Sequence, residues 1–442
     1  MSFIADFHIH SKYSRATSRD MDLEHLEQWA KIKGIKILGT GDFTHPVWFK
    51  ELTSRLEPAE KGLFKIKRHG LNGKSKNGND LGWYTPCFRP EEIRFILTTE
   101  ISCIYSKNNR TRKIHLIVFA PSFEFVEKFN THLGWLGNLK ADGRPILGLD
   151  AKEIVKISLN LSSEAMVVPG HAWTPWFSIF GSMSGFNSIQ ECFDEYSRHI
   201  YAIETGLSSD PAMNWRVADL DDITLISNSD SHSPQKIGRE ANILEGKEIS
   251  YSKITEAIRL GAKAPKSNSL RLIKTVEFFP EEGKYHYDGH RVCKVVFSPQ
   301  ETKKHKNICP VCGRPLTIGV MNRVDELAKR PEEFKKEGAI PYLSLIPLEE
   351  IIADAFGVGV GTKTVDREYK DLINKFGNEF NILMDASRSE LERSTKPEVA
   401  EGIIRVREKK VKIEPGYDGE YGKIKIFSEG EQKGYSKQSS LF

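Results

Sequence analysis

The sequence predicts an α/β protein: an N-terminal barrel or mostly parallel sheet, then a small metal-binding module, then a helical C-terminal region. Three observations lead to this prediction. Short apolar runs alternate with amphipathic helical segments over residues 1–270, as in repeated βα units. Histidines and carboxylates recur where those apolar runs end. Three cysteines gather in residues 286–319, and helical patterning follows over residues 320–427.

Length and composition restrict the class of protein before any motif is considered. A chain of 442 residues is expected to form two or three domains, and 39% hydrophobic residues is ordinary for a globular protein. No apolar run is long enough to span a bilayer and no secretion signal is evident, so we expect a cytoplasmic protein without a membrane partner. Six cysteines are too few for a disulfide scaffold, and a net charge of +4 does not by itself indicate nucleic acid.

The elements of the barrel follow from the apolar runs. The first strand is predicted around Phe3, Ile4, Phe7 and Ile9. The later strands are predicted, in chain order, at Ile35–Leu38, Phe95–Leu97, Ile114–Val118, Met166–Val168, Tyr201–Ile203 and Thr224–Ile226. Amphipathic helices are predicted between several of them, for example Leu23–Lys33 and Tyr251–Leu260.

Residues that can bind metal lie in or just after these strands. His8 and His10 are two apart, so a strand would direct both imidazoles to one face. The others, in chain order, are Asp42, His45, Glu100, His115, His171, Glu204, Asp230 and His232. Barrel enzymes assemble active sites from successive strand ends, and this donor set suits Zn²⁺, Mn²⁺ or Fe²⁺. We therefore predict a multinuclear metal site in which Glu100 can bridge two ions, whereas Glu204 is equally compatible with a supporting role.

Asp210 lies just past the strand that ends near Glu204 and precedes a proline. We predict it as a general acid or base alongside Asp230, with a turn residue as the equally good alternative.

The ordered motifs resemble those of the PHP (polymerase and histidinol phosphatase) superfamily. The resemblance rests on His8-x-His10, Thr40-Gly-Asp42-Phe-Thr-His45, the strand-end Glu100, His115, Pro169-Gly-His171 and Ser229-Asp230-Ser-His232. It implies a distorted (β/α)7 barrel, up to three metal ions and phosphoester hydrolysis. It also implies that His8, His10, Glu100 and Asp230 hold one ion, that His115 and His171 hold another, and that His232 with Asp42 or His45 holds a third. The second motif departs from the usual Thr-Asp-His, and a further histidine often found after the first motif is absent, which makes the third ion the least certain.

The division of the chain follows from composition. We predict a barrel over residues 1–278, a zinc-binding module over 279–320, a helical DNA-binding region over 321–427 and a disordered tail over 428–442. In the module, Cys309-Pro-Val-Cys312-Gly and His290-Arg-Val-Cys293 form two short ligand pairs, which is typical of a structural zinc site. His290 fits this spacing best as the fourth ligand, while His305 and His286 remain alternatives.

Two further motifs bear on the substrate and partner. The segment after His171 contains four aromatic residues, Trp173, Trp176, Phe177 and Phe180. We predict that they either belong to the core or line a pocket for an extruded base. Gln438, Leu441 and Phe442 form a terminal Gln-x-x-Leu-Phe that resembles the peptide by which repair proteins bind the sliding clamp (PCNA).

Taken over its full length, the chain resembles the endonuclease Q family, which is found in archaea and some bacteria. The resemblance implies a nucleoid-associated, metal-dependent DNA repair endonuclease that cuts 5′ of deaminated bases (uracil, hypoxanthine, xanthine) and abasic sites and leaves a 3′-hydroxyl and a 5′-phosphate. We expect a monomer with Zn²⁺ in the module and the barrel, and Mg²⁺ or Mn²⁺ as alternatives in catalysis. The competing interpretations are a phosphoesterase acting on a small phosphate ester and a non-catalytic, clamp-associated scaffold.

Overall fold

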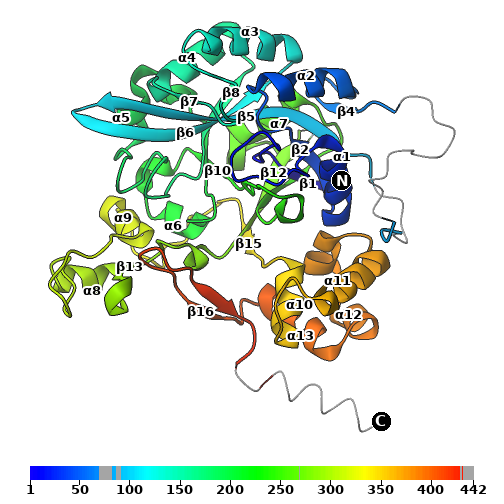
Figure 1. The fold of residues 1–442 in the computed structure, drawn as a ribbon, viewed down its shortest axis with the longest axis vertical. Helices are drawn as coiled ribbons and strands as arrows, with labels where there is room; N and C mark the ends of the chain where they lie inside the picture. The colour runs from blue at the N-terminus through cyan, green and yellow to red at the C-terminus, as the bar shows by residue number, and fades with distance from the viewer. Residues whose placement is uncertain (69–81, 86–90, 268, 429–430, 432–442) are drawn as a thin grey trace.

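The structure, a computed structural model, describes residues 1–68, 82–85, 91–267, 269–428 and 431. Its centre is a sheet of eleven strands whose main path runs β15-β12-β11-β1-β2-β5-β4-β3, with β6 beside β5 and β8 beside β6. A separate parallel pair, β9 and β10, packs next to β8. Helices surround these strands in the upper part of Figure 1, so the α/β barrel class predicted from the sequence is confirmed.

The barrel strands are β1 (Ser2–Asp6), β2 (Ile35–Gly39), β3 (Leu56–Pro58), β4 (Phe64–Ile66), β5 (Arg94–Lys107), β6 (Arg110–Ala120), β7 (Ile146–Leu147), β8 (Met166–Pro169), β9 (Ala202–Glu204), β10 (Thr224–Ile226), β11 (Ala241–Glu245) and β12 (Arg271–Glu277). The helices around them are α1 (Leu23–Lys33), α2 (Pro46–Arg55), α3 (Phe123–Gly134), α4 (Ala151–Leu161), α5 (Ile189–Phe193), α6 (Pro211–Trp215) and α7 (Tyr251–Leu260). The strands β1, β2 and β5 run parallel, as βα connections require.

Helices α1 and α7 have the bounds predicted from the sequence because local caps set them. The Asp22 side chain accepts a hydrogen bond from the His25 N–H at the start of α1, and Gly34 ends that helix at φ 89°. The Ser250 side chain likewise accepts from the Lys253 N–H at the start of α7. These caps can be identified from the sequence without knowledge of the tertiary structure.

Strands β5 and β6 are longer than the apolar runs that predicted them. They pair antiparallel along their whole length, from Leu97 opposite Ala120 to Lys107 opposite Arg110. The outer half of this hairpin extends beyond the barrel, as the long cyan strands in Figure 1 show. Its polar residues, such as Ser106 and Thr111, hid it from a search for apolar runs.

The cysteine module, which the sequence predicts to bind zinc, lies below the barrel (Figure 1). It contains β13 (Asp288–His290), β14 (Val295–Phe297) and α8 (Pro299–Lys304), followed by α9 (Val320–Leu327). Its own buried apolar cluster is limited to Val295, Cys309 and Leu316. A core of that size cannot hold a fold in water, so the module needs a further stabilising element such as a bound metal.

The C-terminal region is mainly helical and forms a separate body at the lower right of Figure 1. It contains α10 (Leu348–Phe356), α11 (Lys363–Phe376), a π-helical turn (Asn381–Asp385), α12 (Arg388–Ser394) and α13 (Pro397–Arg407). The hairpin of β16 (Lys412–Glu414) and β17 (Lys423–Lys425) follows and lies between this body and the cysteine module, where Tyr417 bridges to Tyr287. Strand β15 (Tyr342–Ser344), which precedes α10, pairs in parallel with β12 and so extends the barrel sheet. Contacts therefore cross the predicted boundary between the barrel and the helical region. The domain boundaries remain a prediction from the sequence.

A buried ion pair fastens the helical region to the barrel. Lys33 Nζ at the end of α1 lies 2.6 Å from Glu379 Oε2, and both residues are 4% exposed. The same oxygen accepts a hydrogen bond from the Tyr369 hydroxyl at 2.6 Å, and Glu379 Oε1 accepts one from the Leu348 N–H. The carboxylate thus has a partner on every side.

Replacing Lys33 by Met is expected to destabilise the folded chain by about 3 kcal/mol, because it leaves Glu379 as an unpaired buried charge. The urea midpoint of unfolding measures this change. Lys31→Met is the matched control, since Lys31 pairs with Glu27 near the surface and its loss should cost less than about 1 kcal/mol. Equal shifts for the two variants would contradict a special role for the Lys33–Glu379 pair.

Among the described residues, no helix combines the length and the apolar character that crossing a membrane would require.

Candidate active site

The predicted metal-binding residues converge at one end of the barrel. His8 and His10 follow the end of β1, Glu100 lies within β5, and His115 lies on the neighbouring strand β6, two residues from the position opposite Glu100. Asp230 and His171 follow β10 and β8, and both adopt positive φ, at 47° and 26°. Such backbone conformations are costly for residues other than glycine, and they concentrate at functional sites.

The first group of ligand atoms surrounds one side of Glu100. Oε2 of Glu100 lies 3.3 Å from His10 Nε2 and 3.7 Å from His8 Nε2. Asp230 Oδ1 lies 3.0 Å from His10 Nε2 and 3.8 Å from His8 Nε2. All four residues can place a ligand atom within 4.8 Å of the others, which is a spacing that one metal ion can span.

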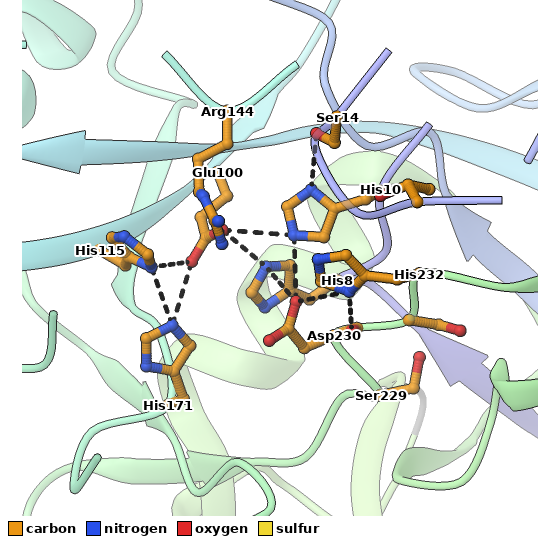
Figure 2. Close-up of polar contacts among 12 residues, drawn as sticks. His8, His10, Ser14, Glu100, His115, Arg144, His171, Ser229, Asp230 and His232 are labelled. Atoms are coloured by element: carbon orange, nitrogen blue, oxygen red, sulfur yellow. Dashed lines mark hydrogen bonds and ion pairs between the residues drawn. The ribbon is translucent and has the colours of Figure 1, made fainter. Parts of the chain in front are cut away.

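The second group of ligand atoms surrounds the other oxygen of Glu100. Oε1 lies 2.6 Å from His115 Nδ1 and 3.1 Å from His171 Nε2, and those two nitrogens are 3.0 Å apart. Figure 2 shows His115 and His171 on one side of Glu100, with His8, His10 and Asp230 on the other. One carboxylate therefore offers one oxygen to each group, which is the arrangement of a ligand that bridges two ions.

Supporting carboxylates set the orientation of the histidines. His8 donates from Nδ1 to Glu204 Oε1 at 3.0 Å, and His10 donates from Nδ1 to Asp42 Oδ1 at 3.0 Å. Both rings therefore direct the lone pair of Nε2 towards Glu100 and Asp230. A carboxylate behind a ligating histidine is the usual outer contact of a metal site, and it is the role that the sequence allowed for Glu204.

An unpartnered nitrogen on His8 is further evidence that these residues are suited to metal ions. His8 Nε2 is buried and has no hydrogen-bond partner among the described residues. Burial opposes protonation of His8, but the charges of Glu204 and Glu100 outweigh it and raise the His8 pKa well above its usual range. A site that accumulates this much negative charge beside an unpartnered nitrogen is suited to a cation.

The third predicted group is not assembled. Asp42 is occupied by His10, by Ser14 and by the backbone and hydroxyl of Ser11. His45 precedes α2 and stacks on Tyr13 at 4.5 Å, while His232 lies over His10 and contacts the Asp230 carbonyl. Within the described part of the chain, no cluster of ligand atoms joins His232 to Asp42 or His45. The expectation of a third ion at these residues is therefore not supported.

Asp210 caps a helix instead of facing the metal cluster. Its Oδ1 accepts the Met213 N–H at the start of α6 at 2.9 Å, and its Oδ2 accepts the Tyr342 hydroxyl at 3.3 Å. These contacts fit the alternative of a turn residue. Asp210 is the N-cap of α6, and a short polar side chain before a helix that starts with proline commonly has this role. The general acid or base role predicted for Asp210 has no contact to support it.

The aromatic residues after His171 divide into two kinds. Trp173 and Phe180 are each 1% exposed and pack together at 4.9 Å, so they belong to the core and leave no room for a base. Phe177 is half-buried, with its ring 4.7 Å from that of His115, and Trp176 is 39% exposed. Of the four residues predicted to be core or to line a base pocket, Trp173 and Phe180 are core, Phe177 lies beside the ligand His115, and Trp176 is exposed against Tyr285.

The cysteine module brings its predicted ligands together. His290, Cys293, Cys309 and Cys312 place their ligand atoms within 4.8 Å of one another. His305 stacks on Phe297, and His286 is buried next to Tyr287, so neither alternative fourth ligand joins the group. Burial and the neighbouring thiols Cys312 and Cys309 raise the Cys293 pKa to about 11, which a bound cation would reverse.

Arg144 is the site residue that the sequence did not reveal. Its Nη1 donates to Glu100 Oε2 at 3.0 Å, and Figure 2 shows the side chain reaching down to that carboxylate. Arg144 lies between α3 and α4 and belongs to no motif, so only the fold brings it to the cluster. Asn228, which donates to Glu204 Oε1 at 2.9 Å, was also missed, although it directly precedes the Ser229-Asp230 motif.

Two buried carboxyl groups beside the site make stability depend on pH. Burial raises the Glu277 pKa to about 7, and burial together with Glu277 raises the Glu240 pKa well above its usual range. The folded state therefore holds protons that the unfolded chain releases near pH 4.5. We expect stability to fall as the pH rises from about 4.5 to about 7.

Thermal unfolding at a series of pH values measures this dependence. Glu277→Gln should flatten the decline across that range, because the amide does not titrate. Glu245→Gln, on an exposed pair with Arg271, is the matched control and should retain the decline. A wild-type protein that becomes more stable over that range would contradict the assignment.

Comparison with known proteins adds the family. The MJ0043 C-terminal domain family matches residues 347–410. The chain is 36% identical over 261 residues to the protein MJ0043 of Methanocaldococcus jannaschii, a match that covers 58% of this chain and 31% of that protein. The chain thus spans about a third of MJ0043. It is 28% identical over 436 residues to YqxK of Bacillus subtilis, covering 95% of this chain and 98% of YqxK.

Two solved structures match nearly the whole chain. The lesion-specific endonuclease PfuEndoQ of Pyrococcus furiosus is 30% identical, with a TM-score of 0.81 over 97% of this chain and 96% of that one. A structure of endonuclease Q with a 27-mer duplex that carries an abasic lesion at the active site is also 30% identical, with a TM-score of 0.79 over 97% of this chain and 98% of that one.

A barrel that presents two groups of ligands around one shared glutamate defines a metal-dependent phosphoesterase of the PHP class. The identity and the coverage of the solved structures then give the particular family. This chain belongs to the endonuclease Q family of DNA endonucleases.

Proposed function

We propose that this protein nicks DNA on the 5′ side of deaminated bases (uracil, hypoxanthine and xanthine) and of abasic sites, leaving a 3′-hydroxyl and a 5′-phosphate. The observation that carries the proposal is Glu100, which offers one oxygen to His10 and the other to His115 and His171. The endonuclease Q structure with an abasic lesion at its active site supports DNA as the substrate.

The residues of the chain divide into those that would hold metal ions and those that orient the ligands. Divalent ions bound there would neutralise phosphate charge and acidify a bound water, which is the chemistry that phosphodiester hydrolysis needs. His8, His10, Glu100 and Asp230 would hold one ion, and Glu100, His115 and His171 would hold the other. Glu204 and Asp42 keep the histidines in the required tautomer, and Phe177 offers an aromatic face beside the ligands.

A strand-resolved nicking assay tests the proposal. Labelled duplexes with one uracil, one hypoxanthine or one abasic site are incubated with Zn²⁺, Mg²⁺ or Mn²⁺, and then with a chelator. We expect a single metal-dependent nick immediately 5′ of the lesion, absent from undamaged DNA. Its 3′-hydroxyl and 5′-phosphate ends should be a substrate for DNA ligase. Turnover of a small phosphate ester without any nicking would favour the phosphatase alternative. No activity on either substrate, together with a barrel that binds no metal, would favour the non-catalytic scaffold.

We also propose that the C-terminal peptide binds the sliding clamp. Gln438, Leu441 and Phe442 lie outside the described residues, so the proposal rests on the sequence motif. Deleting residues 438–442 should leave intrinsic nicking unchanged and remove binding to the clamp, as surface plasmon resonance measures it. Clamp binding by the truncated chain would contradict the proposal.

A further inference from the structure

Arg144 lies beside the ligand cluster, and Arg15 is linked to it through Asp142. Arg144 contacts Glu100 Oε2 at 3.0 Å, with 27% of its side chain exposed. Among the described residues, Glu100 is the hydrogen-bond partner of this guanidinium, which leaves its other N–H donors for a ligand. Arg15 lies on the loop after His10, and 75% of its side chain is exposed.

Asp142 joins the two arginines. Its Oδ1 accepts the backbone N–H of Arg144 at 3.2 Å and that of Arg15 at 3.3 Å, and its Oδ2 lies 3.3 Å from Arg15 Nε. Gly143 is required between them, because a Cβ there would overlap Asp42 Oδ2 and Ser14 Oγ. The close approach of this backbone to the first histidine loop thus directs Arg144 onto Glu100, and Asp142 ties Arg15 to the same backbone.

The charges of the site call for such a pair. Four carboxylates contact the cluster histidines: Asp42, Glu100, Glu204 and Asp230. Two divalent ions would balance them, so a phosphodiester would add a negative charge that the ions no longer offset. A guanidinium binds phosphate oxygens through paired N–H donors and is a usual complement to metal ions in phosphoryl transfer.

We propose that Arg144 and Arg15 form a phosphate-binding subsite for the DNA backbone, in which Arg144 contacts a non-bridging oxygen of the phosphate at the metals and Arg15 contacts the adjacent phosphate. This inference rests on the proposed function for its substrate. Divalent ions held by Glu100 would compete with Arg144 for that carboxylate, which would free the guanidinium for the phosphate. Asp142 acts as the positioning residue for both arginines.

The first test measures binding of inorganic phosphate to the metal-loaded protein by isothermal titration calorimetry. Arg144→Ala should weaken binding by about 10-fold or more, the loss expected for a charge-assisted hydrogen bond, and Arg144→Lys should weaken it less. Arg271→Ala, at the opposite end of the barrel, removes the same charge and should leave the affinity unchanged. Absence of phosphate binding by the wild type, or equal affinity in Arg144→Ala, would overturn the proposal.

The second test separates this subsite from metal binding. Removal of a positive charge beside the ions should leave metal content unchanged or increase metal affinity, whereas loss of metal from Arg144→Ala would mean that the arginine only positions Glu100. In nicking assays, the slope of log kcat/KM against log salt should fall by about 0.9 for each arginine removed. A wild type that nicks no lesion would refute the proposed function alone, because phosphate binding still decides the subsite.

Asp142 variants test the positioning role. Asp142→Ala should lower phosphate affinity to the level of the Arg15→Ala/Arg144→Ala double variant, since both backbones lose their acceptor. Asp142→Asn keeps an Oδ1 acceptor and should restore most of the affinity. Equal loss in the two Asp142 variants would indicate that the charge of Asp142, not its hold on the loops, controls the arginines.

Discussion

Replacing Glu100 by Gln is expected to lower the rate of the proposed lesion-dependent nicking by about 1000-fold or more, the largest loss expected from any single change in the barrel. The substitution keeps the shape of the side chain but leaves an amide, whose NH₂ group cannot bind a cation. Because one Glu100 oxygen lies near His10 and the other near His115 and His171, both ligand groups lose a member at once. Metal analysis of the purified variant should show loss of both barrel ions with retention of the zinc in the module.

Glu204→Gln is the matched comparison, since it removes a buried carboxylate that touches His8 but belongs to neither ligand group. Loss of a supporting contact of this kind costs about 10- to 100-fold, so its rate should lie well above that of Glu100→Gln. Circular dichroism melts establish that both variants fold. A Glu100→Gln protein that keeps its barrel metals, or that nicks as fast as Glu204→Gln, would remove Glu100 from the bridging position.

A larger rate loss in Glu100→Gln than in Glu204→Gln would also show that the site consists of histidines with bridging and supporting carboxylates, and not of histidines alone. The imidazoles of His8 and His10 supply ligand atoms, but their orientation depends on Glu204 and Asp42, which are far from them in sequence. Residues that act only through a histidine should change metal affinity more than they change the pH dependence of the reaction.

The sequence predicts the ligand groups because the ligands obey a local rule. His8, His171 and Asp230 each lie within four residues of the end of a strand that apolar patterning identifies, and strand ends of a barrel share one face. The bounds of α1 and α7 are equally local, since Asp22 and Ser250 cap helices whose apolar spacing is regular.

The remainder depends on contacts that no local pattern encodes. Arg144 reaches Glu100 only because Gly143 lets its loop pass over Asp42. Trp173 carries the same local signal as Trp176, yet packing against Phe180 and a bond from its indole N–H to Asn214 place it in the core. Asp210 follows a strand end as a catalytic residue would, but the helix that starts at Pro211 uses its carboxylate as a cap.

Changing Cys309 and Cys312 to Ser is expected to release a metal from the module and to unfold the module, while the barrel stays folded and keeps its own ions. Cys309 is fully buried, and its N–H donates to the Arg314 carbonyl at 2.8 Å in the tight turn that carries both thiols. Burial opposes ionisation of this thiol, but the N–H groups of Cys312 and Val311 outweigh it and lower the Cys309 pKa to about 6, which favours the thiolate that zinc binds.

The size of the effect follows from the small core of the module. With Val295, Cys309 and Leu316 as its buried apolar cluster, the folding free energy has to come from the metal, which contributes about 10 kcal/mol or more in small zinc domains. Limited proteolysis should therefore cut the variant within residues 286–319, and metal analysis should find one zinc fewer per chain.

Cys103→Ser is the matched control, because this buried cysteine lies on β5 away from the module and its loss removes no zinc ligand. The double variant should retain nicking of a short lesion duplex at saturating DNA, since Glu100 and its partners are intact, and should bind the duplex more weakly. A variant with wild-type zinc content and protease resistance would show that the four residues do not hold a metal. Loss of the barrel ions would instead show that the module supports the active site, because α9 packs on α6 and Arg323 of α9 donates to the Phe180 and Phe186 carbonyls of the segment that follows His171.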